Sequence, residues 1–319
     1  MTVSVLIPAF RAERYIDETI GSVVAQTFSD WEVVAVDDAS PDATGARIEE
    51  WASRDPRIRA LHNESNRGMT GNWNRCLAEA RRDLVIKLDA DDVWKPRTLE
   101  ILVEAMKPAE SVGAAVRTLM CDEQLEPFDG IPGDDVMMNG GVNPYEDHTL
   151  DTARFYELAA HGHQFWSSSA LMLRTEFLRA SGGYDERFGC AADTELIWRT
   201  LEQRGSFAHR AYPGVMYRML AGSISNVYRA NDWVTWEATA GNMLSLSRLR
   251  KTRGLSRALS LRYAALWDRW QSHRQENGKK LPAKMCSNLD AVVANVEPPP
   301  LADRVLLRAR NTAVKLLKG

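Results

Sequence analysis

Cysteine, net charge and long apolar runs are all scarce in this chain, and each shortage argues against a class of protein. The four cysteines among 319 residues stand far apart, without a Cys-X-X-Cys pair, which disfavours a zinc site or disulfide framework and fits a reducing compartment. A net charge of −3 gives no electrostatic basis for binding nucleic acid. The first residues lack the basic segment of a signal peptide, and no run of about 18 apolar residues occurs. We therefore expect a cytoplasmic protein without a membrane-spanning segment.

The first part of the chain alternates short apolar runs with segments of helical periodicity. A hydrophobic fraction of 45% and a charged fraction of 26% are typical of a globular protein. The alternation predicts an α/β fold with a mostly parallel central sheet and helices on both faces. The expected strands are Val3–Ile7, Trp31–Val36, Ile58–Leu61, Leu84–Leu88 and Gly113–Leu119; the expected helices are Tyr15–Gln26, a segment with Ile48 and Trp51 that Ser40 or Asp42 caps, Gly71–Ala80 and Thr98–Met106.

The later part of the chain has a different pattern. Residues 121–148 are rich in Asp, Gly, Pro and Asn, which predicts a long loop or insertion. Strand signals stop near Asn226, so we place a boundary between a domain of residues 1–225 and a helical region of residues 226–319. The expected elements are the helix Thr152–His161, the strand Ser168–Arg174, the helix Asp193–Arg204, and then the helices Trp233–Leu249, Leu255–Ser272, Ala283–Ala294 and Ala302–Leu317.

The most informative feature is the acidic segment that follows the strand Leu84–Leu88, namely Asp89-Ala90-Asp91-Asp92. Open α/β sheets bind ligands at the edge where their strands end. Clustered carboxylates repel one another unless a cation or strong hydrogen bonds compensate, and Mg²⁺ or Mn²⁺ with phosphate co-ligands suits such oxygens. The segment therefore predicts a metal that holds a phosphate-bearing substrate. The alternative is a solvated acidic turn that caps a helix, and the motif alone favours neither.

Three further segments carry polar or aromatic groups to the same predicted edge. Asp38 can accept a hydrogen bond from a base or ribose, or it can cap a helix. Phe10 can form an apolar wall for a nucleobase, although an ordinary strand end is the simpler interpretation. The loop Asn66–Asn74 combines Arg, Gly and amide side chains before a helix. Such a loop suits an anion, but an ordinary turn with a helix cap has the same composition.

A fourth segment joins a glycine turn, Gly182-Gly183, to a helix that begins near Asp193. A carboxylate at a helix start is favoured by the helix dipole, and it can also act as a general base. Arg199 either pairs with an acidic side chain or faces phosphate. The apolar residues of this helix are expected in the core: Leu196, Ile197 and Leu201.

In combination and order, these segments resemble the family 2 glycosyltransferases, which have the Rossmann-like GT-A fold. The resemblance covers residues 3–225 and is far more specific than any single motif. It is carried by Val5–Phe10, Gln26–Glu32, Val36–Ser40, Asn66–Asn74, Leu88–Asp92, Gly182–Glu186 and Asp193–Arg199.

The resemblance implies an inverting transfer of a sugar from a nucleotide-diphosphate donor to a hydroxyl of a glycan or lipid-linked acceptor, in the synthesis of a cell-surface polysaccharide. Residues 1–120 would form the donor half and 121–225 the acceptor half. Asp193 would be the catalytic base, and Asp91 with Asp89 would bind Mg²⁺ or Mn²⁺. The donor would contact Pro8, Ala9, Phe10, Glu13, Asp38, Arg67, Gly68, Asn74, Asp89 and Ala90.

The chain departs from the family pattern at three positions. Ala192 stands where many members have Glu before the base, and Trp73 stands where many have Arg before Asn74. Leu220 stands where members often have His two residues after the Arg of a Tyr-Arg segment. A catalytically idle relative that binds nucleotide or glycan, or assists assembly, is the alternative function. A nucleotidyltransferase is disfavoured by the absence of an N-terminal Gly-rich loop with a basic residue.

The last predicted helix is amphipathic, with basic residues near one face: Arg304, Arg308, Lys315 and Lys318. Such a helix can lie on an anionic membrane surface, where lipid-linked acceptors reside, or pack against its own domain. The tryptophans of the helical region are expected in the core or along an acceptor groove: Trp233, Trp236, Trp267 and Trp270.

Overall fold

The structure is a computed structural model that describes residues 1–128, 145–160, 167–223, 233–252, 254–276 and 283–307. Two compact units divide the chain. Unit 1 comprises Met1–Glu186 and Gln203–Ser223, and unit 2 comprises Arg187–Glu202 and Ile224–Gly319. This division differs from a single boundary near residue 225, because residues 187–202 group with the C-terminal helices. Among the described residues, no helix combines the length and the apolar character needed to cross a membrane.

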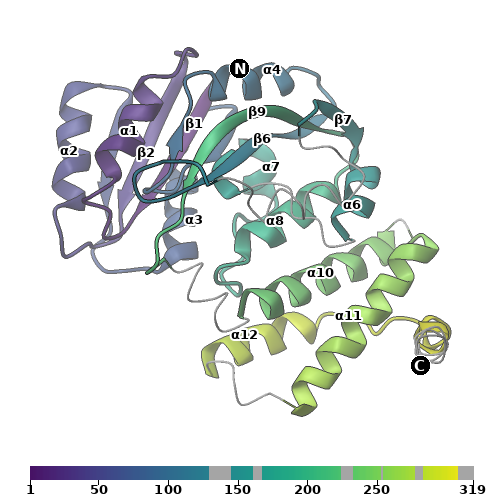
Figure 1. Cartoon of the computed structure of the whole chain (residues 1–319). Helices are drawn as coiled ribbons and strands as arrows, with labels where there is room; N and C mark the ends of the chain where they lie inside the picture. Colours follow the sequence, from purple (N-terminus) through teal and green to yellow (C-terminus); the bar gives the residue numbers. More distant parts are fainter. Residues whose placement is uncertain (129–144, 161–166, 224–232, 253, 277–282, 308–319) are drawn as a thin grey trace. The chain divides into compact units, whose positions relative to one another are not determined.

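Four parallel strands from the first 87 residues form one half of the sheet of unit 1 (Figure 1). Their order is β3 (Ile58–His62), β2 (Trp31–Asp37), β1 (Val3–Ala9) and β4 (Leu84–Lys87). Every residue of β2 and of β4 is buried, as expected for parallel strands that helices cover on both faces. The predicted parallel sheet is confirmed, with each strand within two residues of its expected bounds.

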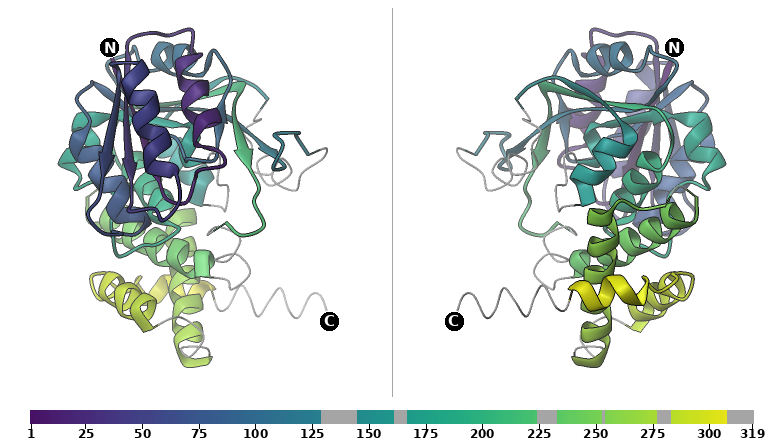
Figure 2. Two further views of the ribbon diagram at one scale, coloured as in Figure 1. Left: turned by 90° about the vertical axis from the view of Figure 1, so that its left-hand side faces the viewer. Right: turned by 90° about the vertical axis from the view of Figure 1, so that its right-hand side faces the viewer.

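Three helices connect these strands: α1 (Ile16–Val24), α2 (Thr44–Arg54) and α3 (Met69–Glu79). The strand order runs outward from β1 to β3 and then returns to β4 on the other side of β1. Since parallel crossovers are right-handed, α1 and α2 cover one face and α3 covers the other, and Figure 2 shows helices on both sides of these strands. The N-cap of α2 is Ala43, without a side-chain cap, rather than the predicted Ser40 or Asp42. Asp42 precedes the cap and accepts the N–H of Thr44, the first residue of the helix, at 3.1 Å.

The second half of the sheet is mixed in direction. From β4 the order continues through β8 (Leu171–Arg174), β6 (Ser111–Cys121) and β9 (Ser206–Arg218) to β5 (Val93–Trp94), and β7 (His148–Asp151) pairs with β9. β8 runs antiparallel to both of its neighbours, and β9 runs parallel to β6. The flanking helices are α4 (Thr98–Ala105), α6 (Thr152–Ala160) and α7 (Thr175–Ala180).

Several predictions for this half need correction. The predicted strand Ser168–Arg174 begins with a short 3₁₀ helix, η1 (Ser168–Ala170), before β8. The strand β9 was not predicted, because its apolar residues are interrupted by His209, Arg210 and Pro213. β7 lies at the end of the segment predicted as a loop, and residues 129–144 of that segment lie outside the described residues.

Unit 2 consists of helices: α8 (Ala192–Leu201), α10 (Trp233–Thr252), α11 (Arg257–Glu276) and α12 (Ala283–Val293) (Figure 1). Met243, Tyr263 and Leu289 are fully buried and mark its core. The rings of Trp236 and Trp270 pack edge to face at 6.3 Å. Of the predicted last helix, residues 301–307 are helical, and residues 308–319 lie outside the described residues.

Candidate active site

The carboxyl ends of β1, β2 and β4 meet at one edge of the sheet of unit 1. Ala9 pairs with Asp37 in the register of β1 and β2, and the N–H of Asp38 donates to the carbonyl of Ala9 at 2.9 Å. The N–H of Leu88 donates to the carbonyl of Leu6 at 2.8 Å. β1 is the point at which the strand order reverses, and open α/β sheets bind ligands at the edge beside such a point.

The segment after β1 presents an aromatic ring at this edge. Phe10 is 44% exposed, whereas Ala9 is fully buried in the strand that also holds Pro8. The guanidinium of Arg11 lies 5.3 Å from the ring centroid of Phe10. Glu13 accepts the N–H of Ala43 at 2.9 Å and so joins this segment to the start of α2. An exposed ring held in this way offers a flat surface on which a planar ligand can stack.

Asp38 organises the loop that precedes α3. Its carboxylate is 2% exposed and accepts hydrogen bonds from the amide of Asn63 at 2.7 Å, the N–H of Arg67 at 2.8 Å and the N–H of Gly68 at 3.0 Å. Gly68 has a φ of +75°, a conformation that favours glycine. The structure therefore brings together Asp38, Arg67 and Gly68, three of the residues predicted to contact the nucleotide-sugar donor. The hydrogen bonds that Asp38 accepts hold the loop in place. Contact of Asp38 with a base stays a prediction.

The acidic segment after β4 begins with a carboxylate that is already paired. Asp89 forms an ion pair with Lys87, whose side chain is 1% exposed. The hydroxyl of Ser168 donates to Asp89 at 3.2 Å, and the N–H of Asp89 donates to the hydroxyl of Ser169 at 3.2 Å. The next residue, Ala90, is buried, and its carbonyl accepts a hydrogen bond from α1. This segment is therefore fixed from several sides.

Asp91 and Asp92 differ from Asp89 in their electrostatics. Burial, together with the charge of Asp89, raises the pKa of Asp91 to about 6. Burial and the charges of the other two carboxylates raise the pKa of Asp92 well above its usual range. Asp92 is 1% exposed and accepts the hydroxyl of Ser169 at 2.6 Å and the N–H of Arg218 at 3.1 Å. Asp91 and Asp89 are less buried than Asp92, so they are the two carboxyls of this segment that a ligand can approach.

Arg218, at the end of β9, holds the acidic segment in place. Its Nε donates to the carbonyl of Asp91 at 2.8 Å, and its guanidinium forms an ion pair with Glu18 of α1 at 2.6 Å. The guanidinium also lies 4.6 Å from the ring centroid of Tyr15. Arg218 is 4% exposed. A buried cation at this place offsets part of the negative charge of the segment.

Lys87 is a second buried cation that contacts the acidic segment, through its ion pair with Asp89. The sequence did not predict this role of Lys87. Its ammonium lies 4.2 Å from the ring centroid of Trp73 in α3, and the Trp73 ring packs edge to face against Tyr184 at 5.0 Å. A cation over an aromatic face is stabilised by the ring quadrupole. The available signal was a single charged residue inside an otherwise apolar strand.

Asn74 fastens α3 to the predicted glycine turn. Its Nδ2 donates to the carbonyl of Tyr184 at 2.9 Å, and its Oδ1 accepts the N–H of Tyr184 at 2.8 Å. A Cβ on Gly183, which has a φ of +72°, would lie 2.6 Å from that Oδ1. Both ends of the amide are thus engaged within unit 1, and a contact of Asn74 with a donor stays a prediction.

The predicted base belongs to unit 2. Asp193 lies in the first turn of α8, and its carboxylate accepts the N–H of Thr194 at 2.6 Å. The expected core residues of this helix are buried: Leu196, Ile197 and Leu201. Arg199 takes the first of its two predicted roles, because its Nε donates to Glu195 at 2.7 Å.

A model of the family "Glycosyl transferase family 2" matches residues 4–135. The N-terminal part of the chain belongs to this family. The match contains every donor residue and metal ligand predicted from the sequence. Asp193 and the helical region lie beyond it.

Several curated relatives are named glycosyltransferases. An uncharacterized glycosyltransferase of Nostoc is 40% identical over 114 residues, which are 35% of each chain. One of Haemophilus influenzae is 26% identical over 228 residues, or 71% of this chain and 68% of the relative. The Escherichia coli protein named UDP-Glc:alpha-D-GlcNAc-diphosphoundecaprenol beta-1,3-glucosyltransferase WfgD is 36% identical over 104 residues, or 33% of this chain and 40% of the relative. The chain thus spans about a third of the first of these relatives.

Solved glycosyltransferase structures have the same GT-A fold. The S. aureus TarS 1-349 structure in complex with UDP-GlcNAc has a TM-score of 0.66 at 18% identity and covers 93% of this chain and 82% of that chain. A Pyrobaculum calidifontis mannosyltransferase in complex with GDP-Man and Mn²⁺ has a TM-score of 0.58 at 17% identity and covers 98% of this chain and 80% of that chain. The α/β fold predicted from the sequence is confirmed.

The edge of the family 2 domain fits a divalent metal of the kind that the resemblance implies. Across the part of the chain that the structure describes, no group of three or more His, Cys, Asp or Glu side chains is placed to hold a metal ion. Mg²⁺ sites, however, often use one or two protein carboxylates, and substrate phosphates and waters complete the shell. Asp91 and Asp89 meet this requirement, because the pKa of Asp91 is raised partly by Asp89 and a cation would relieve that repulsion.

The departures of this family 2 domain from the common pattern have structural counterparts. Trp73 stands in α3 where many family members have Arg, and its ring packs against the ammonium of Lys87. The cation in this region therefore comes from β4 and not from α3. Ala192 is fully buried at the start of α8. Leu220 follows Arg218, which holds Asp91 through its backbone. Arg218 was visible in the sequence only as part of a Tyr-Arg segment, without an indication of its partners.

Proposed function

We propose that this protein is a metal-dependent inverting glycosyltransferase that moves a sugar from a nucleotide-diphosphate donor to a hydroxyl of a glycan or lipid-linked acceptor. The observation that carries the proposal is the meeting of Phe10, Asp38 and Asp89–Asp92 at the edge where the strand order reverses. Relatives named a glucosyltransferase and a putative teichuronic acid biosynthesis glycosyltransferase support a role in cell-surface polysaccharide synthesis.

In the proposed reaction, the carboxylate of Asp193 takes the proton from the acceptor hydroxyl while that oxygen forms a bond to the anomeric carbon. The bond between the anomeric carbon and the diphosphate breaks, and the electron pair leaves with the nucleoside diphosphate. One in-line displacement inverts the anomeric configuration, so an α-linked donor yields a β-glycoside. A metal ion held by Asp91 and Asp89 would stabilise the negative charge of the leaving diphosphate.

The donor-binding part of the proposal assigns separate tasks along the edge. Phe10 stacks on the nucleobase, and the loop anchored by Asp38 closes over the nucleoside. Lys87 and the hydroxyl of Ser168 hold the Asp89 carboxylate in place to contact the ribose and diphosphate. The further donor contacts are Pro8, Ala9, Glu13, Arg67, Gly68, Asn74 and Ala90.

A thermal-shift screen tests the donor assignment. UDP, GDP, UDP-glucose, UDP-N-acetylglucosamine and GDP-mannose are each added with Mn²⁺ and with EDTA. A ligand that binds the native state raises the melting temperature, so we expect one nucleotide class to shift it with Mn²⁺ and much less with EDTA. Binding without turnover of any donor would favour the idle relative, and no shift with any nucleotide would contradict the proposal.

We also propose that the protein works in the cytoplasm, at the inner face of the membrane, through its C-terminal helix. The exposed Leu301 and Val305 in the helical residues 301–307 support this, whereas Arg304 is paired with Asp268 at 3.5 Å. Flotation with vesicles that contain anionic lipid, with and without residues 300–319, tests it. We expect the shortened chain to float less, and equal flotation would contradict the membrane contact.

A further inference from the structure

A buried carboxylate of α10 holds the loop that leads into α8. Glu237 is 2% exposed. Its Oε1 accepts the N–H of Gly189 at 2.9 Å, and its Oε2 accepts the N–H of Ala191 at 3.0 Å. Each oxygen therefore takes one backbone donor from a segment of three residues. Hydrogen bonds to an ionised acceptor are stronger than neutral ones and define the geometry of the donors.

This loop ends two residues before Asp193. Burial raises the pKa of Glu237, and the charge of Asp193 raises it further, while the N–H groups of Ala191 and Gly189 oppose the rise. The two carboxylates are thus close enough to interact within unit 2. Ala191 and Ala192 are 1% and 0% exposed, so the backbone that carries Asp193 is itself enclosed.

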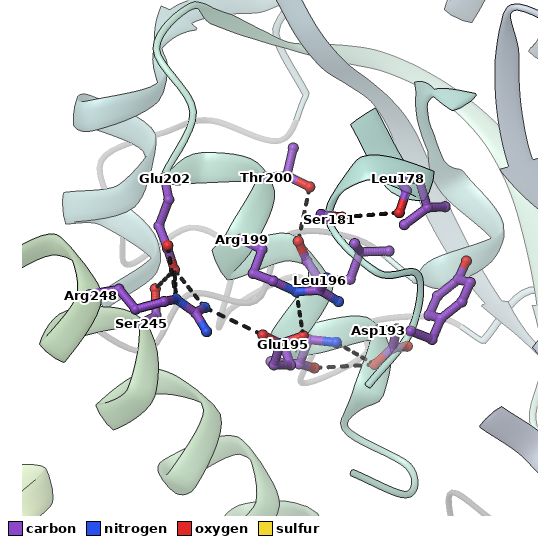
Figure 3. Close-up of polar contacts among 12 residues, drawn as sticks. Leu178, Ser181, Asp193, Glu195, Leu196, Arg199, Thr200, Glu202, Ser245 and Arg248 are labelled. Atoms are coloured by element: carbon purple, nitrogen blue, oxygen red, sulfur yellow. Dashed lines mark hydrogen bonds and ion pairs between the residues drawn. The ribbon is translucent and has the colours of Figure 1, made fainter. Parts of the chain in front are cut away.

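One face of α10 contacts both the loop and α8. Glu237, Gly241, Ser245 and Arg248 follow one another at helical spacing. A Cβ on Gly241 would lie 3.5 Å from the ring of Phe188 and 3.6 Å from Glu195. Arg248 pairs with Glu195 in the first turn of α8 at 3.4 Å and with Glu202 at the far end of that helix at 2.7 Å (Figure 3).

We propose that Glu237 is a positioning residue for Asp193, and that α10 is thereby a working part of the catalytic machinery. The inference rests on the proposed function, because it takes Asp193 as the base. Glu237 fixes the backbone at Gly189 and Ala191. This sets the direction in which the side chain of Asp193 projects from α8. A displacement of a catalytic group by about 1 Å can cost about 10²-fold in rate.

The test compares Glu237→Gln with the matched control Glu202→Gln. Both changes remove the charge of a carboxylate at the same helix pair. Glu202 accepts the hydroxyl of Ser245 at 2.5 Å and pairs with Arg248, and it lies beyond the end of α8 that is opposite to Asp193 (Figure 3). In Glu237→Gln, the side-chain NH₂ must face a backbone N–H, so one of the two loop bonds is lost. Glu237→Asp restores the charge at a shorter reach.

Two measurements are made on the full-length chain. Amide hydrogen exchange reports the protection of Gly189 and Ala191. Release of UDP or GDP from UDP-glucose, UDP-N-acetylglucosamine and GDP-mannose with Mn²⁺ reports turnover, and calorimetry with UDP or GDP and Mn²⁺ reports the Kd. We expect Glu237→Gln to lose protection at these two amides and about 10- to 100-fold in kcat with an unchanged Kd. Glu237→Asp should recover part of the kcat, and Glu202→Gln should keep it.

The outcomes separate this inference from the proposed function. Unchanged protection and unchanged kcat in Glu237→Gln, together with loss of turnover in Asp193→Asn, would overturn the role of Glu237 and leave the base in place. An equal loss of kcat in Glu202→Gln would also overturn it, because any disturbance of the helix pair would then suffice. If Asp193→Asn keeps full turnover, the proposed base fails, and the role of Glu237 fails with it.

Discussion

Replacing Gly183 by alanine should destabilise unit 1 more than the same change at the adjacent Gly182. Both residues have left-handed backbone conformations, with φ values of +72° and +90°. A Cβ on Gly182 would meet no atom within 4 Å, whereas a Cβ on Gly183 would lie 2.6 Å from Oδ1 of Asn74 and 3.3 Å from Leu77. The pair therefore separates the backbone cost from the cost of the contact.

The magnitude follows from these two parts. A left-handed conformation costs a residue with a side chain about 1–2 kcal/mol, which is the whole expected effect of Gly182→Ala. Gly183→Ala also pushes the Asn74 amide away from the N–H of Tyr184, which it accepts at 2.8 Å. A buried donor left without a partner costs about 1–3 kcal/mol. The expected destabilisation is therefore about 2–5 kcal/mol for Gly183→Ala.

Urea unfolding, followed by tryptophan fluorescence and extrapolated to water, measures these free energies. Asn74→Ala supplies the double-mutant cycle. In that background Gly183→Ala should cost only the backbone part, about 1–2 kcal/mol, because the clashing atom is gone. Equal effects at Gly182 and Gly183, or strict additivity with Asn74→Ala, would refute the proposed link between α3 and the turn.

Three further predictions concern the carboxylates. Asp193→Asn should leave Mn²⁺-dependent UDP or GDP binding unchanged in calorimetry and lower sugar transfer by about 10²-fold or more, because the base is lost while the donor residues remain; full transfer would rule Asp193 out. Asp91→Ala should weaken the Mn²⁺-dependent binding about 10-fold or more, and an unchanged Kd would remove Asp91 from the metal site. The pKa of Asp91 is about 6 in the fold and about 4 in an unfolded chain, so its protonated form contributes stability that is complete below pH 4 and is lost as the pH rises through 6. Without metal, the melting temperature should therefore fall between pH 4 and 7 relative to Asp91→Asn, and parallel curves would contradict the shifted pKa.

The parallel half of the fold could be predicted because its signals are local. The strands β1, β2 and β4 are short, mostly apolar runs, and a helix begins seven residues after the end of each strand from β1 to β3. β9 gave no such signal: His209, Arg210 and Pro213 interrupt it, and it is held by pairing with β6, roughly a hundred residues earlier. Register shifts in that pairing, as between Val116 and Arg117, further weaken any alternation in the sequence.

The candidate site likewise combines a segment that the sequence predicts with partner residues that it does not predict. The acidic segment could be located because the end of β4 could be located. Its partners could not, since Arg218 and Ser169 come from strands and turns that only long-range pairing brings to this edge. The role of Glu237 was hidden for another reason: α10 has the composition of an ordinary packing helix, and the carboxylate acts on backbone groups that carry no sequence signature.

The strand order of unit 1 also has a consequence for synthesis on the ribosome. The strands β1 to β4 are complete once residue 87 has emerged, but the free side of β4 is closed by β8, which begins at Leu171. At about 5–20 residues per second, the roughly 80 intervening residues take about 4–17 s. During that interval the nascent chain presents an unpaired, apolar strand edge, the feature that promotes aggregation. Translation speed between residues 87 and 171 should therefore affect the yield of folded protein more than translation speed in the helical region.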